Sequence, residues 1–247
     1  LGRVSTYYHQ LLSWPAYADK FTVVETTVTS YDDDDGISIQ VDTHTLRRWY
    51  LDGKLHREHD LPALVNSGGE RGWYRYGKLH RVHDRPAFID VASYISGEWY
   101  QHGDLHRDRD RPASIQTNGN RVWGQHDKIH RDHDKPAIIT SSGHLEWRQH
   151  GDHHRDHDRP AVIKSDGIRE WRIQGVLHRD HDRPAVIGRK GSHEWYQQNQ
   201  PHRCHDRPAI IYYRGICRWA RHGYLKRRYR RPTVISGFRV ELDNSRN

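Results

Sequence analysis

The stretch LHRDHDRPAVI, from Leu177 to Ile187, places histidine, arginine and aspartate in close order. A histidine beside an aspartate can act as a general base, and the same two residue types can ligate zinc. Arginine and aspartate can instead form bidentate ion pairs. The stretch therefore has three interpretations, as an active site, as a metal site or as a structural network.

The active-site interpretation requires one asymmetric place that holds a nucleophile and a pocket. This stretch is not unique, because its first histidine recurs along the chain, and no serine or cysteine nucleophile recurs with it. The recurring positions are His56, His80, His106, His130, His154, His178 and His202. The pattern predicts a protein that is not an enzyme, with no catalytic residue and no cofactor.

The metal interpretation rests on His178, His181 and Asp182, which offer nitrogen and oxygen ligands that zinc accepts. Two observations oppose it. Residues three apart on an extended link point in different directions. In the third copy, Arg109 stands where the other copies have the second histidine, and a cation there opposes a metal ion. We therefore predict no metal site.

The structural interpretation treats the stretch as a ladder of ion pairs and hydrogen bonds. The planar guanidinium of Arg179 can hold two carboxylate oxygens or the backbone carbonyls of the next copy. Asp182, which lies close before Pro184, can accept N–H groups of a turn, and His178 can lie beside Trp171. We predict that these five residues form a structural ladder that satisfies the polar link between stacked copies.

The copies belong to a repeat that covers most of the chain. Its clearest marker is a tryptophan spaced by 24 residues, with one gap of 26, which defines eight units. These tryptophans are Trp49, Trp73, Trp99, Trp123, Trp147, Trp171, Trp195 and Trp219. Gly, Asp or Asn follows each tryptophan four residues later, which predicts a turn with positive φ. Motifs such as SDG at Ser165 predict a second turn before the next tryptophan.

The residues between the two turns have the composition of β-strands. Each unit reads as one β-hairpin, in which a strand of the type PAVI and a strand of the type EWY are followed by the histidine-rich link. Alternation predicts that Ala185 and Ile187 are buried together with Trp171 and Leu177. The gap of 26 predicts a longer hairpin loop near Asp90. One hairpin cannot bury its apolar face alone, but stacked copies can.

The predicted fold is all-β, an elongated array of eight antiparallel β-hairpin repeats of about 24 residues. Three regions follow: residues 1–48 as an N-terminal cap with a strand beginning near Phe21 and a degenerate half-repeat, residues 49–237 as the eight repeats, and residues 238–247 as a C-terminal tail.

Two motifs carry a resemblance to a known family. EWYQHGDLHRD at Glu98 resembles a MORN repeat, and the longer pattern GxLHRDxDxPAVI resembles the MORN-like repeat of proteins from giant DNA viruses. The resemblance covers the chain from Trp49 to near Gly237. It implies an elongated β-repeat sheet or solenoid used for protein contacts, with no catalytic residue. MORN units have Gly after the histidine where this chain has Arg, as at Arg179, which departs from the lipid-binding groove ascribed to MORN arrays.

Composition agrees with a thin apolar core. Hydrophobic residues make up 34% of the chain and charged residues 29%, yet there are 9 Trp and 14 Tyr. Aromatic residues bury large areas from few positions. The two cysteines, Cys204 and Cys217, provide no disulfide framework. No apolar run is long enough to span a membrane. The 22 histidines lead us to expect sensitivity to acid.

The formal charge of +8 lies in one segment. Residues 214–231 hold seven Arg and one Lys with no acid, which equals the whole excess. This basic segment either caps the array and keeps it soluble, or docks an acidic partner surface. The candidate docking patch consists of Lys226, Arg227, Arg228, Arg230 and Arg231. Nucleic acid is not the expected partner, because the other repeats lack a basic stripe.

These observations predict a non-enzymatic structural or interaction protein. The resemblance implies a minor capsid, cement or surface component of a large virus particle, which assembles in the host cytoplasm and contacts other structural proteins. The alternative is a cytosolic MORN-like scaffold that binds a protein partner or a lipid headgroup. Either protein could form homo-oligomers.

Overall fold

The computed structural model describes residues 5–11, 20–29, 42–213 and 215–225. The chain divides into two compact units, Leu1–Lys128 and Ile129–Asn247. Within the described residues, every regular element is a β-strand except the short 3-10 helix η1 (Arg189–Gly191). The predicted all-β array of antiparallel hairpins is therefore confirmed.

Unit 1 begins with three antiparallel strands, β1 (Ser5–Leu11), β2 (Lys20–Thr29) and β3 (Asp42–Leu51). Strand β2 covers the segment in which the sequence predicts a strand. Strand β3 pairs with β2 along its whole length and continues past residue 48. The boundary predicted between the cap and the repeats thus lies inside one continuous strand.

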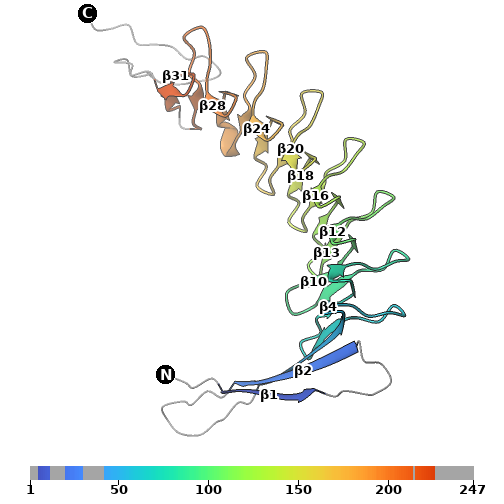
Figure 1. Cartoon of the computed structure of the whole chain (residues 1–247). Helices are drawn as coiled ribbons and strands as arrows, with labels where there is room; N and C mark the ends of the chain where they lie inside the picture. The colour runs from blue at the N-terminus through green and yellow to red at the C-terminus, as the bar shows by residue number, and fades with distance from the viewer. Residues whose placement is uncertain (1–4, 12–19, 30–41, 214, 226–247) are drawn as a thin grey trace, which may run out of the picture. The chain divides into compact units, whose positions relative to one another are not determined.

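A main ladder of short strands follows β3 in unit 1. Each strand of this ladder pairs antiparallel with the next strand of the ladder, and Figure 1 shows the succession of short strands after β3. The strands after β3 are β5 (Leu64–Asn66), β6 (Arg71–Gly72), β9 (Phe88–Asp90), β10 (Ile95–Glu98), β13 (Ser114–Gln116) and β14 (Arg121–Val122).

Unit 2 contains a main ladder of the same kind, in which each strand again pairs antiparallel with the next strand of the ladder. Its strands are β17 (Ile138–Ile139), β18 (Leu145–Glu146), β21 (Val162–Ile163), β22 (Arg169–Glu170), β25 (Val186–Ile187), β26 (His193–Glu194), β29 (Ile210–Ile211) and β30 (Cys217–Arg218).

Each repeat also forms a second, smaller hairpin from the residues after its tryptophan. The sequence predicts a turn at this place but not the strand pair around it. In unit 1 these strands are β4 (Lys54–Leu55), which pairs with the end of β3, then β7 (Tyr74–Arg75), β8 (Lys78–Leu79), β11 (Tyr100–Gln101), β12 (Asp104–Leu105) and β15 (Gly124–Gln125). Strand β16 (Lys128–Ile129) spans the boundary of the units. In unit 2 they are β19 (Arg148–Gln149), β20 (Asp152–His153), β23 (Arg172–Ile173), β24 (Val176–Leu177), β27 (Tyr196–Gln197), β28 (Gln200–Pro201), β31 (Ala220–Arg221) and β32 (Tyr224–Leu225).

The second hairpins close through two-residue turns in which both residues have positive φ. Gln174 (φ 48°) and Gly175 (φ 80°) join β23 to β24 in this way. Two successive residues of positive φ make a turn whose twist matches that of the flanking strands, so a strand pair forms where the sequence predicts only a bend. Glycine and Asn or Asp at the second position make this conformation accessible.

The core is a narrow seam at the junction of the two ladders. Ala185 is fully buried and Trp171 is 7% exposed, and the corresponding Ala and Trp residues of the neighbouring repeats are equally buried. Leu177 and Ile187, which alternation places in the buried set, are only half-buried. The Trp171 N–H bonds the Ala185 carbonyl of the main ladder, and its carbonyl accepts the His178 N–H at the end of the second hairpin. The buried residues therefore lie where the chain passes from the main ladder into the second hairpin, and the rest of each strand is only partly buried.

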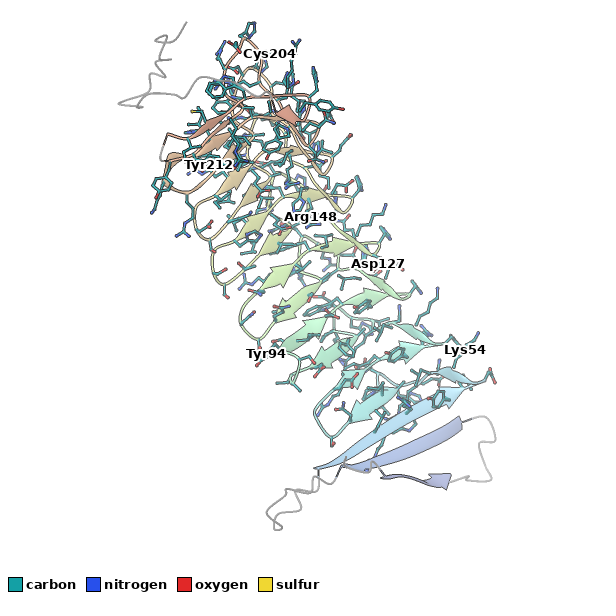
Figure 2. The ribbon with its side chains drawn as sticks, turned by 90° about the vertical axis from the view of Figure 1, so that its left-hand side faces the viewer. Lys54, Tyr94, Asp127, Arg148, Cys204 and Tyr212 are labelled. Carbon is teal, nitrogen blue, oxygen red and sulfur yellow. The ribbon has the colours of Figure 1, made fainter. Side chains whose placement is uncertain are left out.

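The longer unit contains the predicted longer hairpin, between β9 and β10. Its strands pair with a register shift between Ile95 and Glu98, so the additional residues produce a bulge. Tyr94 lies in the turn with φ 63° and is 68% exposed. Figure 2 shows Tyr94 and Lys54 at opposite edges of unit 1, so the turns of the main hairpins and those of the second hairpins lie on different sides.

Candidate functional site

The histidine-rich link is a loop that returns the chain from the second hairpin to the main ladder. At its tip, His181 (φ 59°) and Asp182 (φ 53°) both adopt the left-handed conformation. Histidine and aspartate are among the residues that tolerate this region best. Arg109, which replaces the histidine in one repeat, has the same conformation with φ 61°. The second histidine therefore occupies a turn position that does not require an imidazole.

Five links bind the preceding link through an arginine and an aspartate. Arg179 Nε donates to Asp158 Oδ1 at 2.6 Å, and Arg179 Nη2 donates to Asp158 Oδ2 at 3.1 Å. This bidentate geometry matches the fork of the guanidinium to the carboxylate. The same pair of bonds joins Arg81 to Asp60, Arg107 to Asp84, Arg155 to Asp134 and Arg203 to Asp182.

The arginine also contacts its own repeat. Arg179 Nη1 donates to the Pro184 carbonyl at 3.0 Å, and the guanidinium lies over the Trp171 ring at 3.7 Å from the centroid. Trp171 Nε1 in turn donates to the Asp158 carbonyl at 2.9 Å. The sequence suggests His178 as the neighbour of the indole, but Arg179 covers the ring face. Trp171 and Arg179 of one repeat thus bind one aspartate of the preceding repeat.

A second, more exposed arginine completes the contact. Arg183 Nη1 bonds Asp158 Oδ2, and its side chain is 54% exposed, whereas that of Arg179 is 13% exposed. The hydrogen bond from Arg179 is the largest cause that lowers the pKa of Asp158, with Arg183 contributing further. The corresponding bond from Arg81 lowers the pKa of Asp60 to about 2. The aspartates are therefore charged at neutral pH, where they accept bonds from arginines rather than from turn N–H groups as the sequence suggests.

In three links, the first histidine forms hydrogen bonds through both ring nitrogens. In His154, Nδ1 accepts the Gln174 N–H of the next repeat at 3.2 Å, and Nε2 lies 3.1 Å from Asp156 Oδ1. An amide N–H can only donate, so Nδ1 carries no proton and Nε2–H donates to the carboxylate. The same two contacts occur at His106 with Asp108 and at His130 with Asp132.

A different polar cluster lies on the main ladder around Glu146. Its carboxylate accepts bonds from His144 Nε2 at 2.7 Å, Arg148 Nε at 2.7 Å and His153 Nε2 at 2.9 Å. The bond from His153 lowers the pKa of Glu146 most, and those from His144 and Arg148 add to the effect. Sequence analysis missed this cluster. The histidines lie two residues before and seven residues after the glutamate, and only the second hairpin brings the latter back to it.

The arrangement of ligand atoms does not favour a metal ion. In the described part of the chain, no group of three or more His, Cys, Asp or Glu side chains could hold one. The two imidazoles at Glu146 bind different carboxylate oxygens, and Arg148 brings a cation to the same group. His130 and His150 stack at 4.8 Å between ring centroids, so their ring nitrogens do not converge.

A cavity of about 300 Å³ lies at the last described link. It is lined by Arg203, Cys204, His205, Asp206, Arg207, Trp219, Ala220 and Arg221. Most of its walls are link residues that correspond to the arginine, aspartate and tryptophan of the other repeats. Both cysteines are free thiols, and burial raises the pKa of Cys217.

Of the predicted ladder residues, Trp171, Arg179 and Pro184 meet in one contact. His178 joins Trp171 only through its backbone N–H, and its side chain bonds Asp180. Asp182 bonds Arg203 of the following repeat. The candidate docking patch Lys226, Arg227, Arg228, Arg230 and Arg231 lies outside the described residues. Searches of protein-family models, of curated proteins and of solved structures found no match to the chain. The described residues contain no helix of the length and apolarity that a membrane span requires.

Proposed function

We propose that the chain is a non-enzymatic structural and interaction protein, a repeat scaffold that binds other structural proteins. The observation that carries the proposal is the use of the histidine-rich link. Arg179 of one link binds Asp158 of the preceding link. The Pro184 carbonyl and the indole N–H of Trp171 take part in the same contact. The arginine–aspartate pair recurs in other links. Residue types that could form an active site therefore hold neighbouring repeats together.

The binding surface that fits this function is the outer side of the second hairpins. The last residue of the first strand in each of seven second hairpins is exposed, and its type changes along the chain while the link contact stays the same. These residues are Arg75, Gln101 and Gln125 in unit 1 and Gln149, Ile173, Gln197 and Arg221 in unit 2. Repeat scaffolds recognise partners through variable side chains on a constant frame. Neutral amides favour a protein partner, because a polyanion such as nucleic acid is bound mainly through Lys and Arg side chains.

The setting that the MORN-like resemblance suggests is a large virus particle, in which the chain is a minor capsid, cement or surface component. The test is cross-linking mass spectrometry on native particles, with a photoreactive residue at Gln149 or Gln197 and a control at Ser165 in a main-hairpin turn. Cross-links from Gln149 and Gln197 to coat proteins, absent from Ser165, support the proposal. Recovery of the chain only in cytosolic fractions supports the adaptor alternative, and cross-links spread equally over all three positions contradict the binding surface.

A further inference from the structure

One main-hairpin turn of unit 1 contains the only Asn–Gly pair of the chain, Asn118–Gly119. The turn joins β13 to β14, and both residues are exposed. Gly119 has φ 90° and carries no Cβ, so no side chain of its own shields its backbone nitrogen. Turns at the surface are more mobile than the strands that they connect. This pair is therefore accessible both to water and to local motion.

The side chain of Asn118 is folded back over the peptide that follows it. Its Oδ1 accepts the Asn120 N–H at 3.0 Å, a bond that asparagine in turns often makes to the backbone two residues further on. Because this bond closes a small ring around the Gly119 peptide, it keeps Cγ of Asn118 close to the Gly119 nitrogen. It also withdraws electron density from the side-chain carbonyl, which makes Cγ a better target for a nucleophile.

We propose that Asn118 is a deamidation site, at which the Gly119 backbone nitrogen attacks Cγ of Asn118. The bond between this nitrogen and Cγ forms, the bond between Cγ and Nδ2 breaks, and the proton of the Gly119 nitrogen leaves with Nδ2 as ammonia. The product is a cyclic succinimide. Water then opens either of its carbonyls and leaves aspartate or isoaspartate at position 118, so the reaction consumes one water and requires no other reagent.

The native turn restrains the attacking nitrogen. The Gly119 N–H donates to the Gln116 carbonyl at 3.0 Å, and the Gln116 N–H donates to the Asn120 carbonyl at 2.9 Å. The first of these bonds must open before the nitrogen can reach Cγ of Asn118. Because the net contribution of one such bond is small, we expect Asn118 to react about fivefold more slowly in the folded chain than in the unfolded chain.

Other asparagines in the described part of the chain provide comparisons. Asn66 is held at both ends of its amide, because its Nδ2 bonds Glu70 Oε2 at 2.7 Å and its Oδ1 accepts the Glu70 N–H at 2.9 Å. Asn199 Oδ1 accepts a backbone N–H of the preceding repeat at 2.7 Å. The residues that follow them, Ser67 and Gln200, have a Cβ that hinders attack by the backbone nitrogen. We therefore expect neither to deamidate at a comparable rate.

The chain already contains an equivalent turn with aspartate in this position. In unit 2, Asp166 Oδ1 accepts the Ile168 N–H at 3.2 Å, and the Gly167 N–H donates to the Lys164 carbonyl at 2.9 Å. These two bonds correspond to those of the Asn118 turn. The aspartate product is therefore compatible with the hairpin, to which it adds one negative charge.

The isoaspartate product has a different effect on the turn. Its backbone runs through the former side chain, so the main chain between β13 and β14 becomes one atom longer. The bond from the Gly119 N–H to Gln116 and the bond from the Thr117 N–H to the Tyr94 carbonyl at 2.8 Å then cannot both keep their geometry. Formation of isoaspartate therefore loosens the contact between this turn and the longer hairpin of β9 and β10.

The experiment incubates the full chain at mildly alkaline pH, either folded or unfolded in urea, and follows its peptides by mass spectrometry. The peptide with Asn118 is expected to gain the mass that replaces an amide by an acid, about fivefold more slowly in the folded chain. Isoaspartate is identified by methylation with protein isoaspartyl methyltransferase. Asn66 and Asn199 are expected to stay intact in the folded chain over the same time.

Two variants complete the test. Asn118→Ser is the matched control, because Ser142–Gly143 forms the equivalent turn of another repeat and serine cannot deamidate. Asn118→Asp shows the effect of the aspartate product alone. Amide exchange at Thr117 is expected to stay unchanged in both variants, whereas the isoaspartate species is expected to lose about tenfold in protection there.

Three results would overturn the proposal. The first is an intact Asn118 in the folded chain after the unfolded chain has reacted completely. The second is deamidation of Asn66 and Asn199 at the same rate as Asn118 in the folded chain. The third, which concerns the effect on the turn, is unchanged protection of the Thr117 amide in the isoaspartate species.

Discussion

Replacing Arg179 with methionine is expected to reduce the free energy of unfolding by about 2–3 kcal/mol. The bidentate contact contributes about 1–2 kcal/mol, because Asp158 is 37% exposed and water can partly replace the guanidinium. The bond to the Pro184 carbonyl contributes about 1 kcal/mol, and the cation over Trp171 contributes about 0.5 kcal/mol. Methionine keeps an apolar stem of similar length, so the change removes mainly the charge and the hydrogen bonds.

Arg183→Met is the matched control for this variant. Arg183 binds the same carboxylate through one nitrogen, but its side chain is 54% exposed. Its replacement is expected to cost less than about 0.5 kcal/mol, the usual contribution of an exposed ion pair. Each variant removes one positive charge that bonds Asp158, so the difference between their unfolding free energies measures the effect of burial and geometry.

The assay is urea unfolding followed by tryptophan fluorescence and circular dichroism, with the slope compared between variants to detect changes in cooperativity. A double-mutant cycle of Arg179→Met with Asp158→Asn is expected to give a coupling energy of about 1–2 kcal/mol. If Arg179→Met and Arg183→Met destabilise the protein equally, or if the coupling energy is zero, the link does not hold adjacent repeats together as described.

Three further predictions concern the backbone, the carboxylates and the second polar cluster. Gly151→Ala is expected to cost about 1–2 kcal/mol in urea unfolding although no atom lies within 4 Å of the added Cβ, because φ is 99° there; an unchanged midpoint would contradict this reason. The lowered pKa values of Asp60 and Asp158 predict stability that is complete above pH about 4 and lost as the pH falls toward 2, measured as a falling thermal midpoint; a midpoint independent of pH in this range refutes it. Glu146→Gln is expected to reduce the free energy of unfolding by about 2 kcal/mol, because His144, His153 and Arg148 lose an ionised partner. In the control Glu194→Gln, the carboxylate that is lost accepts the Tyr196 hydroxyl, and the expected cost is under about 1 kcal/mol. Equal costs in urea unfolding would show that the cluster does not stabilise the fold.

Local chemistry in the sequence is sufficient to predict the turns and the main hairpins. Gly175 and the SDG motif at Ser165 mark places where the backbone must adopt positive φ, and the apolar segments between such places favour strands. The recurrence of the first link histidine in seven units also leads us to predict that no single copy of the link is a unique active site. These inferences depend on neighbours along the chain, which one sequence contains.

Contacts across repeats could not be derived in the same way. The sequence indicates that Arg179 binds carboxylates, but only the fold shows that Asp158 of the preceding repeat is the partner and that Asp182 serves the following one. The face of Trp171 is covered by Arg179 because the second hairpin turns the link back over the seam. The same hairpin brings His153 to Glu146.

The sequence by itself determined the period, the strand class and the positions where the chain reverses, since these follow from steric preferences of single residues and from alternation. The tertiary structure decided which charged groups meet, which ring nitrogen of each histidine accepts a bond, and where burial ends. Those properties depend on the distance between one repeat and the next, and that distance is set by the stacking of two ladders.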